Sequence, residues 1–341
     1  MKMKAVVLKD KVKMGDQIAP VYYEDVNVPK PGKGEVLIRL RNAAINRRDV
    51  FVRYGAYPGI QVPSILGSDG AGTIEELGEG VEGLATGDEV VINPSLNWGD
   101  NPHFQGPNYT TLGVPTDGTY AQYIKIAAEN VFPKPKHLTW EEAAAIPLAG
   151  LTAYRAVVTK AEAKEGETVI IPGIGGGVAN FALQIAVAKG AKVFVTSSSD
   201  QKIENAISLG ASGGVNYRND NWVNELKNLT GGADISIDSI GGDTFNDLIT
   251  LAKPGSKIVS FGATLGPVNN VVMPRIFFKQ MHIMGSMMGT PEEFGKMLEL
   301  YEDQQLKPVI DKVYPLEEVE KAHEQMDKGN VSGKIVLSIP E

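Results

Sequence analysis

The clearest candidate for chemistry is a glycine-rich segment, Pro172 to Ala179, which reads Pro-Gly-Ile-Gly-Gly-Gly-Val-Ala. It stands between an apolar run at 168–171 and a stretch at 178–188 whose apolar residues have helical spacing. Glycines in such a strand-to-helix turn remove Cβ atoms, so that backbone amides can approach a pyrophosphate. If Gly176 is the second glycine of G-x-G-x-x-G, Ile174 replaces the first. The segment predicts a dinucleotide site with contacts from Gly175, Gly176, Gly177 and Val178.

The residues that follow the next apolar strand indicate which dinucleotide this is. NAD sites usually place an acidic residue about 20 positions after the glycine loop, where it binds the ribose 2′-hydroxyl. Here 194–199 reads Phe-Val-Thr-Ser-Ser-Ser, and the nearest acid, Asp200, lies past the strand end. Hydroxyls followed by Lys202 suit a 2′-phosphate, which a carboxylate would repel. The alternative is that 197–200 only caps the next helix. We expect NADPH as the cofactor.

Cysteine is absent, and the four histidines at 103, 137, 282 and 323 are widely scattered. No pair of histidines has the spacing of a helix or a turn, and no thiolate is present to bind zinc. The sequence predicts neither disulfides nor a metal site.

The composition sets further limits. The 341 residues suffice for two domains. A net charge of −8 argues against partners such as nucleic acid or an anionic membrane surface. The N-terminal apolar run is too short for a signal peptide, and no stretch approaches the roughly 18 apolar residues of a membrane span. We expect a cytoplasmic location.

The elements that must position these residues change in character along the chain. Short Val- and Ile-rich pieces between Pro and Gly predict a β-barrel or sandwich over the first 125 or so residues. From Thr139, which can cap a helix, strands and helices alternate, which predicts a parallel sheet with helices on both faces. The tail at 334–339 is again strand-like. We expect one domain over 1–128, completed by 300–341, and a second over 129–299.

In combination these segments resemble the medium-chain dehydrogenase/reductase superfamily, and within it the zinc-free quinone oxidoreductase-like branch. The likeness spans nearly the whole chain and is carried, among others, by Pro31-Gly32-x-Gly-Glu-Val-Leu-Ile, Gly87-Asp88-Glu-Val, Gly118-Thr-Tyr-Ala-Gln-Tyr, Gly150-Leu-Thr-Ala-Tyr, Asp238-Ser-Ile-Gly-Gly and Gly333-Lys-Ile-Val-Leu. The resemblance implies an α/β chain with a GroES-like β-barrel catalytic domain and a Rossmann domain with a doubly wound parallel sheet.

The resemblance also aligns this chain with the zinc ligands of metal-dependent members. Asn46 falls at their first cysteine, Gly67-Ser68-Asp69 replaces their Gly-His-Glu, and Leu148 falls near the last cysteine. None of these side chains can complete a tetrahedral zinc site. The resemblance therefore implies a zinc-free enzyme.

The same resemblance implies roles for individual residues. Asn46 and Tyr57 would polarise or protonate the substrate, and Thr152 would contact the nicotinamide. Tyr57 could instead only cover a barrel turn, and Thr152 could bond its own helix backbone. The residues implied to contact the cofactor, beyond the glycine loop, are Ser198, Lys202 and Tyr217 at the 2′-phosphate, Lys334, and the loops that contain Ser239, Gly262, Ala263 and Thr264.

Without a Lewis acid, charge on the acceptor oxygen must be stabilised by hydrogen bonds alone. This favours a small conjugated carbonyl substrate, a quinone or an α,β-unsaturated carbonyl, because conjugation spreads the charge. Two alternatives stay open. One is an alcohol dehydrogenase-like or enoyl-thioester reductase, whose basic entrance could use Arg47, Arg48 and Arg53. The other is a non-catalytic NADPH-binding sensor. By family analogy, pairing through 281–286 would make a homodimer.

Overall fold

A computed structural model describes residues 1–329 and 331–341 of the chain. It divides into two compact units: unit 1 is Met1–Ala149 with Gly289–Glu341, and unit 2 is Gly150–Met288. Helix α2 (Trp140–Ala145) contacts strands β3 (Glu35–Ala44) and β5 (Asp69–Leu77) of unit 1. The segment after residue 128, which the sequence assigns to the Rossmann domain, is therefore packed on the barrel up to Ala149.

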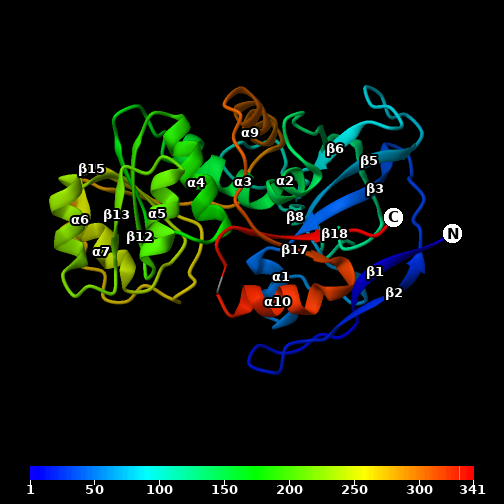
Figure 1. Cartoon of the computed structure of the whole chain (residues 1–341), viewed down its shortest axis with the longest axis horizontal. Helices are drawn as coiled ribbons and strands as arrows, with labels where there is room; N and C mark the ends of the chain where they lie inside the picture. The colour runs from blue at the N-terminus through cyan, green and yellow to red at the C-terminus, as the bar shows by residue number, and fades with distance from the viewer. Residues whose placement is uncertain (330) are drawn as a thin grey trace. The chain divides into compact units, whose positions relative to one another are not determined.

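Unit 1 is built on a seven-stranded sheet in the order β10-β6-β5-β3-β18-β17, with β9 also paired to β3 (Figure 1). A three-stranded sheet in the order β2-β1-β4 and the pair β7-β8 complete it. Strand β18 comes from the far end of the chain and pairs antiparallel with β3, with Val336 opposite Ala44. The other strands are β1 (Lys2–Leu8), β2 (Val21–Asn27), β4 (Ser64–Ile65), β6 (Glu89–Ile92), β7 (Ser95–Leu96), β8 (Thr110–Thr111), β9 (Tyr123–Ala127), β10 (Val131–Pro133), β17 (Ile310–Pro315) and β18 (Lys334–Ser338).

Four further helices belong wholly or partly to unit 1: α1 (Arg47–Arg53), α3 (Pro147–Tyr154), α9 (Pro291–Asp303) and α10 (Val319–Asp327). Thr139 caps α2 as predicted, because its hydroxyl accepts a hydrogen bond from the backbone of Glu142, whose carboxylate accepts one from the backbone of Thr139. The chain passes from unit 1 to unit 2 within α3, which a short π-helix at Arg155–Lys160 continues.

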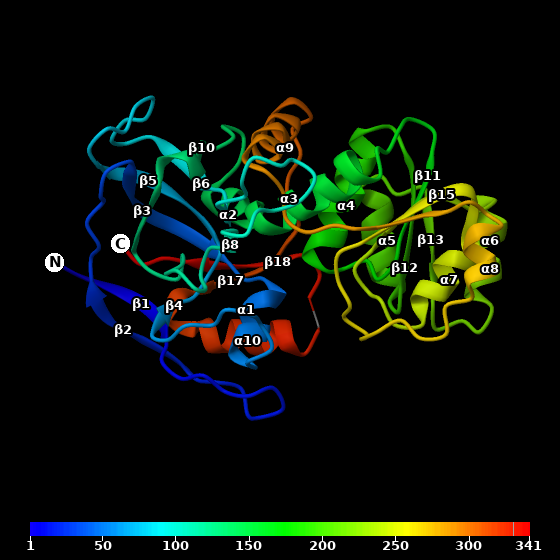
Figure 2. The same cartoon turned by 180° about the vertical axis from the view of Figure 1, so that it is seen from behind.

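Unit 2 holds a six-stranded sheet in the order β13-β12-β11-β14-β15-β16, in which every pairing is parallel. This confirms the predicted Rossmann-like sheet. Figure 2 shows the same unit from behind, with α8 beside α7. The strands are β11 (Thr168–Ile171), β12 (Lys192–Ser197), β13 (Gly213–Asn216), β14 (Ala233–Asp238), β15 (Ala252–Ser260) and β16 (His282–Gly285). The helices are α4 (Gly177–Ala188), α5 (Asp200–Ser208), α6 (Trp222–Thr230), α7 (Thr244–Leu251) and α8 (Met273–Phe277).

One lysine closes the end of α7. The ammonium of Lys279 donates to the carbonyls of Ile249, Thr250 and Ala252 at 2.7, 3.1 and 2.8 Å. Carbonyls at a helix C-terminus lack partners within the helix, and a cation there is favourable.

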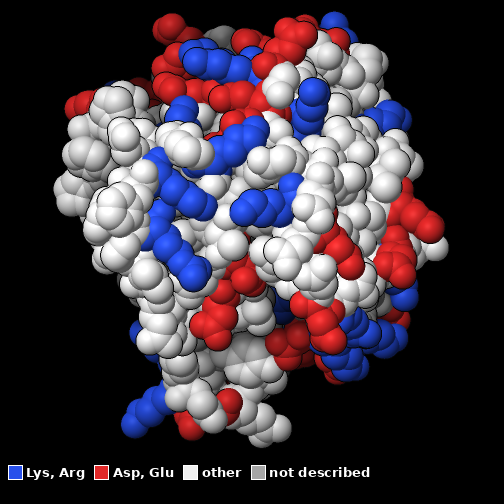
Figure 3. Space-filling view, turned by 90° about the vertical axis from the view of Figure 1, so that its left-hand side faces the viewer, with Lys and Arg blue, Asp and Glu red and all other residues white. Residues whose placement is uncertain are grey.

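On the face of unit 2 that carries α6 and α7, Lys and Arg side chains gather near the middle (Figure 3).

Among the described residues, no helix combines the length and the apolar character needed to cross a membrane.

Candidate functional site

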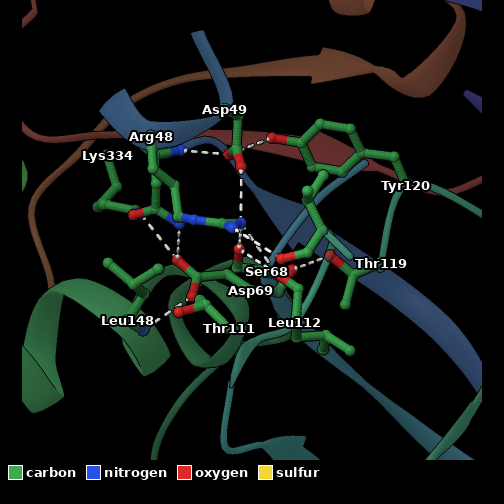
Figure 4. Close-up of polar contacts among 12 residues, drawn as sticks. Arg48, Asp49, Ser68, Asp69, Thr111, Leu112, Thr119, Tyr120, Leu148 and Lys334 are labelled. Carbon is green, nitrogen blue, oxygen red and sulfur yellow. Dashed lines mark hydrogen bonds and ion pairs between the residues drawn. The ribbon is translucent and has the colours of Figure 1, made fainter. Parts of the chain in front are cut away.

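A buried polar cluster forms where four segments of unit 1 meet (Figure 4). Asn46 precedes α1, Asp69 begins β5, Leu148 lies in α3, and Lys334 begins β18. One carboxylate oxygen of Asp69 accepts hydrogen bonds from Lys334 Nζ at 2.8 Å and from Asn46 Nδ2 at 2.9 Å. Its other oxygen accepts from the backbone N–H of Leu148 at 2.8 Å. Lys334 Nζ also donates to Asn46 Oδ1 at 2.7 Å.

The cluster is almost completely shielded from water, with exposed fractions of 0% for Asp69, 2% for Lys334 and 6% for Asn46. A buried carboxylate is costly unless it is paired and hydrogen-bonded. Three donors, one of them the Lys334 ammonium, meet that requirement for Asp69. We call Asn46, Asp69 and Lys334 the buried triad.

A second buried carboxylate, Asp49, lies beside the triad in the first turn of α1. Its Oδ2 accepts hydrogen bonds from the backbone N–H of Asn46 at 2.9 Å and from the Tyr120 hydroxyl at 2.8 Å. Burial raises the pKa of Asp49 above its ordinary value, while the Arg48 guanidinium, 3.6 Å away, acts in the opposite direction. Burial, together with Asp49, raises the pKa of Tyr120 well above its ordinary value. Two carboxylates and two cations thus lie together, buried from bulk solvent.

Arg48 fixes the surroundings of Tyr57. Its Nη1 donates to Ser68 Oγ at 2.6 Å and to the Leu112 carbonyl at 2.9 Å. The guanidinium carbon lies 4.6 Å from the centre of the Tyr57 ring, within the range of a cation–π interaction. Among the described residues, Arg48 Nε is buried and has no hydrogen-bond partner. The ring of Tyr57 therefore rests on a guanidinium that α1 holds in place.

The side chains at the positions matched to zinc ligands do not fit a zinc ion. Asn46 Oδ1 accepts from an ammonium, the Ser68 hydroxyl donates to the Leu112 carbonyl at 2.7 Å, and the Leu148 side chain is a hydrocarbon with no ligating atom. Zinc in proteins needs thiolate, imidazole or carboxylate ligands in tetrahedral geometry. Within residues 1–329 and 331–341, no group of three or more His, Cys, Asp or Glu side chains could hold a metal ion.

In unit 2 the predicted glycine loop leads into α4, with Gly176 as the residue before its first turn. Gly175 has a φ of +128°, in the region that favours glycine. A Cβ added there would lie 2.8 Å from Lys202 Cδ and 3.0 Å from Lys202 Nζ. The Lys202 side chain thus lies against the loop, and Gly177 and Val178 open a helix with no acidic residue in its first turn. A helix N-terminus and a nearby ammonium suit an anion such as a phosphate.

The predicted residues of the second strand end also come together. Ser198 directly follows β12, and Tyr217 directly follows β13, the neighbouring parallel strand. The backbone N–H of Tyr217 donates to the Ser197 carbonyl at 3.0 Å. The nearby acid, Asp200, accepts a hydrogen bond from Asn216 Nδ2 at 2.8 Å. Ser198 and Tyr217 thus follow neighbouring strand ends, while the carboxylate of Asp200 is engaged with Asn216.

The remaining predicted cofactor residues follow β14 and β15. The Thr264 hydroxyl donates to the Ser239 carbonyl at 3.1 Å, which joins the two loops. A Cβ at Gly262 would come 2.8 Å from the same carbonyl, so the close approach of these loops requires glycine there. Ala263 lies between Gly262 and Thr264 in the loop after β15. Thr152 lies in α3, where its buried hydroxyl donates to Met288 Sδ at 3.7 Å.

Sequence reasoning missed the partners of Asn46. Lys334 and Asp69 lie 265 positions apart in sequence, and neither residue type nor spacing marks them as a pair. The alternative of a basic entrance made by Arg47, Arg48 and Arg53 finds no support at two of the three residues. Arg48 and Arg53 are both buried, and Arg53 Nη2 donates to both oxygens of Glu320 at 2.8 and 2.7 Å.

Comparison with known proteins finds a matching dehydrogenase family for each of the two units. The family described as "Alcohol dehydrogenase GroES-like domain" matches residues 32–136, and that described as "Zinc-binding dehydrogenase" matches residues 177–303. A zinc-type alcohol dehydrogenase-like protein of Leptosphaeria maculans is 37% identical, with 98% of this chain and 99% of that protein covered. A quinone oxidoreductase of Mus musculus is 31% identical, with 92% of each covered.

Solved structures agree with these relatives. A crystal structure of an NAD-dependent alcohol dehydrogenase superimposes with a TM-score of 0.93 at 39% identity and covers 99% of this chain and 100% of that one. Family matches in both units, near-complete coverage and a shared fold lead to one conclusion. The chain is an oxidoreductase of the medium-chain dehydrogenase/reductase superfamily, which includes quinone oxidoreductase-like members.

Proposed function

We propose that this protein is an NADPH-dependent, zinc-independent oxidoreductase that reduces quinones or α,β-unsaturated carbonyls by hydride transfer. The observation that supports this most strongly is the buried triad. At the position matched to the first zinc ligand, this chain has an asparagine whose side chain is hydrogen-bonded to the Lys334 ammonium and the Asp69 carboxylate. Polarisation of an acceptor oxygen must then come from hydrogen-bond donors.

Conjugated acceptors suit this chemistry. Hydride arrives at carbon, and the resulting negative charge spreads through the conjugated system to oxygen, where a few donors can stabilise it. An unconjugated aldehyde would place the whole charge on one oxygen. We assign the donor role to Asn46 Nδ2 and to the Tyr57 hydroxyl, which also supplies the proton that completes the reduction.

NADPH, when bound, supplies the hydride. Gly175, Gly176, Gly177 and Val178 would bind its pyrophosphate at the start of α4, and Ser239 with Gly262, Ala263 and Thr264 would lie along it. Lys202, Ser198 and Tyr217 would bind its 2′-phosphate. Thr152 would contact the nicotinamide. The engagement of Asp200 with Asn216 favours NADPH over NADH, because that carboxylate is turned to β13.

Lys202 tests the choice of nucleotide. The substitution Lys202→Ala should weaken NADPH binding while leaving NADH binding nearly unchanged, as measured by titrating the protein with each nucleotide and following the fluorescence of the reduced nicotinamide. An equal effect on the binding of both nucleotides would contradict the proposed 2′-phosphate site.

The activity itself is tested by NADPH oxidation over a panel of quinones, enones, enoyl thioesters and aldehydes, with the zinc content of the same preparation measured. We expect turnover of quinones or enones without zinc. Stoichiometric zinc, or turnover of aldehydes alone, would favour the alcohol dehydrogenase-like alternative. Turnover of thioesters alone would favour the enoyl-thioester reductase. Saturable NADPH binding with no oxidation would identify a non-catalytic sensor.

We also propose that the protein forms a homodimer through β16. This strand is at the edge of the six-stranded sheet, and large apolar side chains are exposed on it and beside it, namely Phe277, Phe278, Ile283 and Met287. An unpaired strand edge with apolar flanks is a template for pairing with a second copy about a twofold axis. Light scattering after size exclusion should give twice the chain mass, and Ile283→Lys should give the monomer.

A further inference from the structure

The orientation of the Asn46 carboxamide is set by its two charged partners. Lys334 carries only donors, so the atom that faces it at 2.7 Å must be the amide oxygen. Asp69 as a carboxylate carries only acceptors, so the atom that faces it at 2.9 Å must be the amide nitrogen. Because the two partners have opposite hydrogen-bonding character, a flipped amide would lose both hydrogen bonds. The ammonium and the carboxylate are also bonded to each other at 2.8 Å, which closes the arrangement.

This arrangement leaves one of the two Asn46 Nδ2 hydrogens to donate to another molecule. The amide nitrogen bears two hydrogens, and Asp69 accepts one of them. The amide oxygen is bonded to an ammonium, which draws electron density toward oxygen and makes the remaining N–H a stronger donor. The triad therefore holds one polarised N–H of Asn46 in a fixed direction, in surroundings that are buried from bulk solvent.

We infer that Lys334 is a positioning residue for substrate reduction: its ammonium orients and polarises the Asn46 carboxamide so that the second Nδ2 hydrogen binds the developing oxyanion. This inference rests on the proposed function, and it gives Lys334 a role different from a direct contact with the cofactor. Asp69 completes the arrangement as the acceptor that holds the amide nitrogen.

The two roles for Lys334 predict different kinetics. If Lys334 acts through Asn46, Lys334→Met should lower kcat by about 10- to 100-fold, a part of what removal of a whole oxyanion donor costs. The dissociation constant of NADPH should hardly change. In an Asn46→Ala background, Lys334→Met should have little further effect on kcat, because the group through which it acts is gone. Lys334→Arg, which keeps the cation, should recover most of the lost rate.

Lys134 is a matched control within unit 1. Its ammonium pairs with Glu89 at 3.2 Å, its side chain is 6% exposed, and it lies outside the triad. Lys134→Met should leave kcat unchanged even if it lowers stability. Lys334→Met could fail to fold because Asp69 loses its counter-ion. In that case the double variant Asp69→Asn with Lys334→Met, which removes both charges, is compared with Asn46→Ala and Lys134→Met instead.

A binding measurement separates this inference from the proposed activity. The probe is 4-nitrophenol in the presence of NADP⁺, because its absorbance distinguishes the phenol from the phenolate. An oxyanion-binding N–H should lower the pKa of the bound probe in the wild type. Asn46→Ala and Lys334→Met should both reduce that shift, to what the Tyr57 hydroxyl and the cofactor supply in the case of Asn46→Ala, whereas Lys334→Arg and Lys134→Met should keep it.

The outcomes are distinct. A shift that needs both Asn46 and Lys334 supports the inference, even if no acceptor is reduced and the proposed activity fails. No shift in the wild type, or a shift that Lys334→Met leaves unchanged in size, overturns the inference. So does a Lys334→Met defect that is additive with Asn46→Ala and appears as a raised NADPH dissociation constant, because Lys334 would then bind the cofactor directly.

Discussion

Replacing His323 with glutamine is expected to reduce the loss of stability of unit 1 between pH 7 and pH 4.5 by about 2 to 3 kcal/mol. His323 is fully buried in α10, and its Nδ1 lies 2.7 Å from Arg53 Nη1. Because a guanidinium can only donate, Nδ1 must be the acceptor, and the ring is neutral with its proton on Nε2. Burial and then the charge of Arg53 lower the pKa of His323 from 6.5 to about 3.

The lowered pKa sets the sign and the size of the effect. Between pH 6.5 and 3 the unfolded chain binds a proton at His323, whereas the folded chain does not. The free energy of unfolding therefore falls as the pH falls. At 1.36 kcal/mol per pKa unit, the full effect is about 5 kcal/mol, of which about 2 to 3 kcal/mol is lost between pH 7 and pH 4.5. Glutamine offers an oxygen to Arg53 and has no proton to gain.

The assay compares urea unfolding of the wild type and His323→Gln at both pH values. Trp222→Phe in both proteins leaves Trp98 and Trp140, which report on unit 1. The other three histidines and all carboxylates are common to both proteins, so their contributions cancel in the difference. If the two proteins lose the same free energy of unfolding on acidification, His323 is not held neutral and the reasoning is wrong.

Three further predictions concern single positions. Tyr57→Phe should lower kcat by roughly 10²-fold or more in steady-state assays if its hydroxyl donates the proton, with an unchanged KM for NADPH; an unchanged kcat would leave the ring with a packing role over Arg48. Gly175→Ala should weaken nucleotide binding, measured by fluorescence titration, because its φ of +128° is strained for alanine and its Cβ would displace Lys202; full affinity would show that the loop does not bind the nucleotide. Thr139→Ala should lower the free energy of unfolding by about 1 kcal/mol, since it removes the cap of α2; no change in urea unfolding would contradict that role.

Secondary structure was predictable where pattern and burial agree. The apolar run at 168–171 is strand β11 with the bounds expected, and every residue of it is buried. Strand β13 was missed because Gly213 and Gly214 remove its apolar pattern. A Cβ at Gly214 would come 2.8 Å from side-chain atoms of Ile203 and Val195, so packing requires glycine at this position. The same glycine breaks the apolar pattern by which the strand would be recognised in the sequence.

The candidate site was predictable in part. The glycine loop and Lys202 lie together in space, and the family match pointed to Asn46. The buried partners of Asn46 were not predictable, because a lone aspartate and a lone lysine at distant positions are ordinarily surface residues. Helix α10 has its buried residues at 319, 322, 323 and 326, which is helical spacing. Because one of the four is a histidine, the sequence alone does not show a continuous apolar face there.

The antiparallel pairing of β18 with β3 has a consequence for biosynthesis. Unit 1 is interrupted by the whole of unit 2, and Lys334 reaches the ribosome exit only after residues 150–288 have emerged. Until then Asp69 has no counter-ion, and closing the barrel around it would bury an unpaired charge. Unit 2 is continuous in sequence and can fold as soon as it is made. During translation, unit 2 can therefore fold before unit 1, although unit 1 contains the start of the chain.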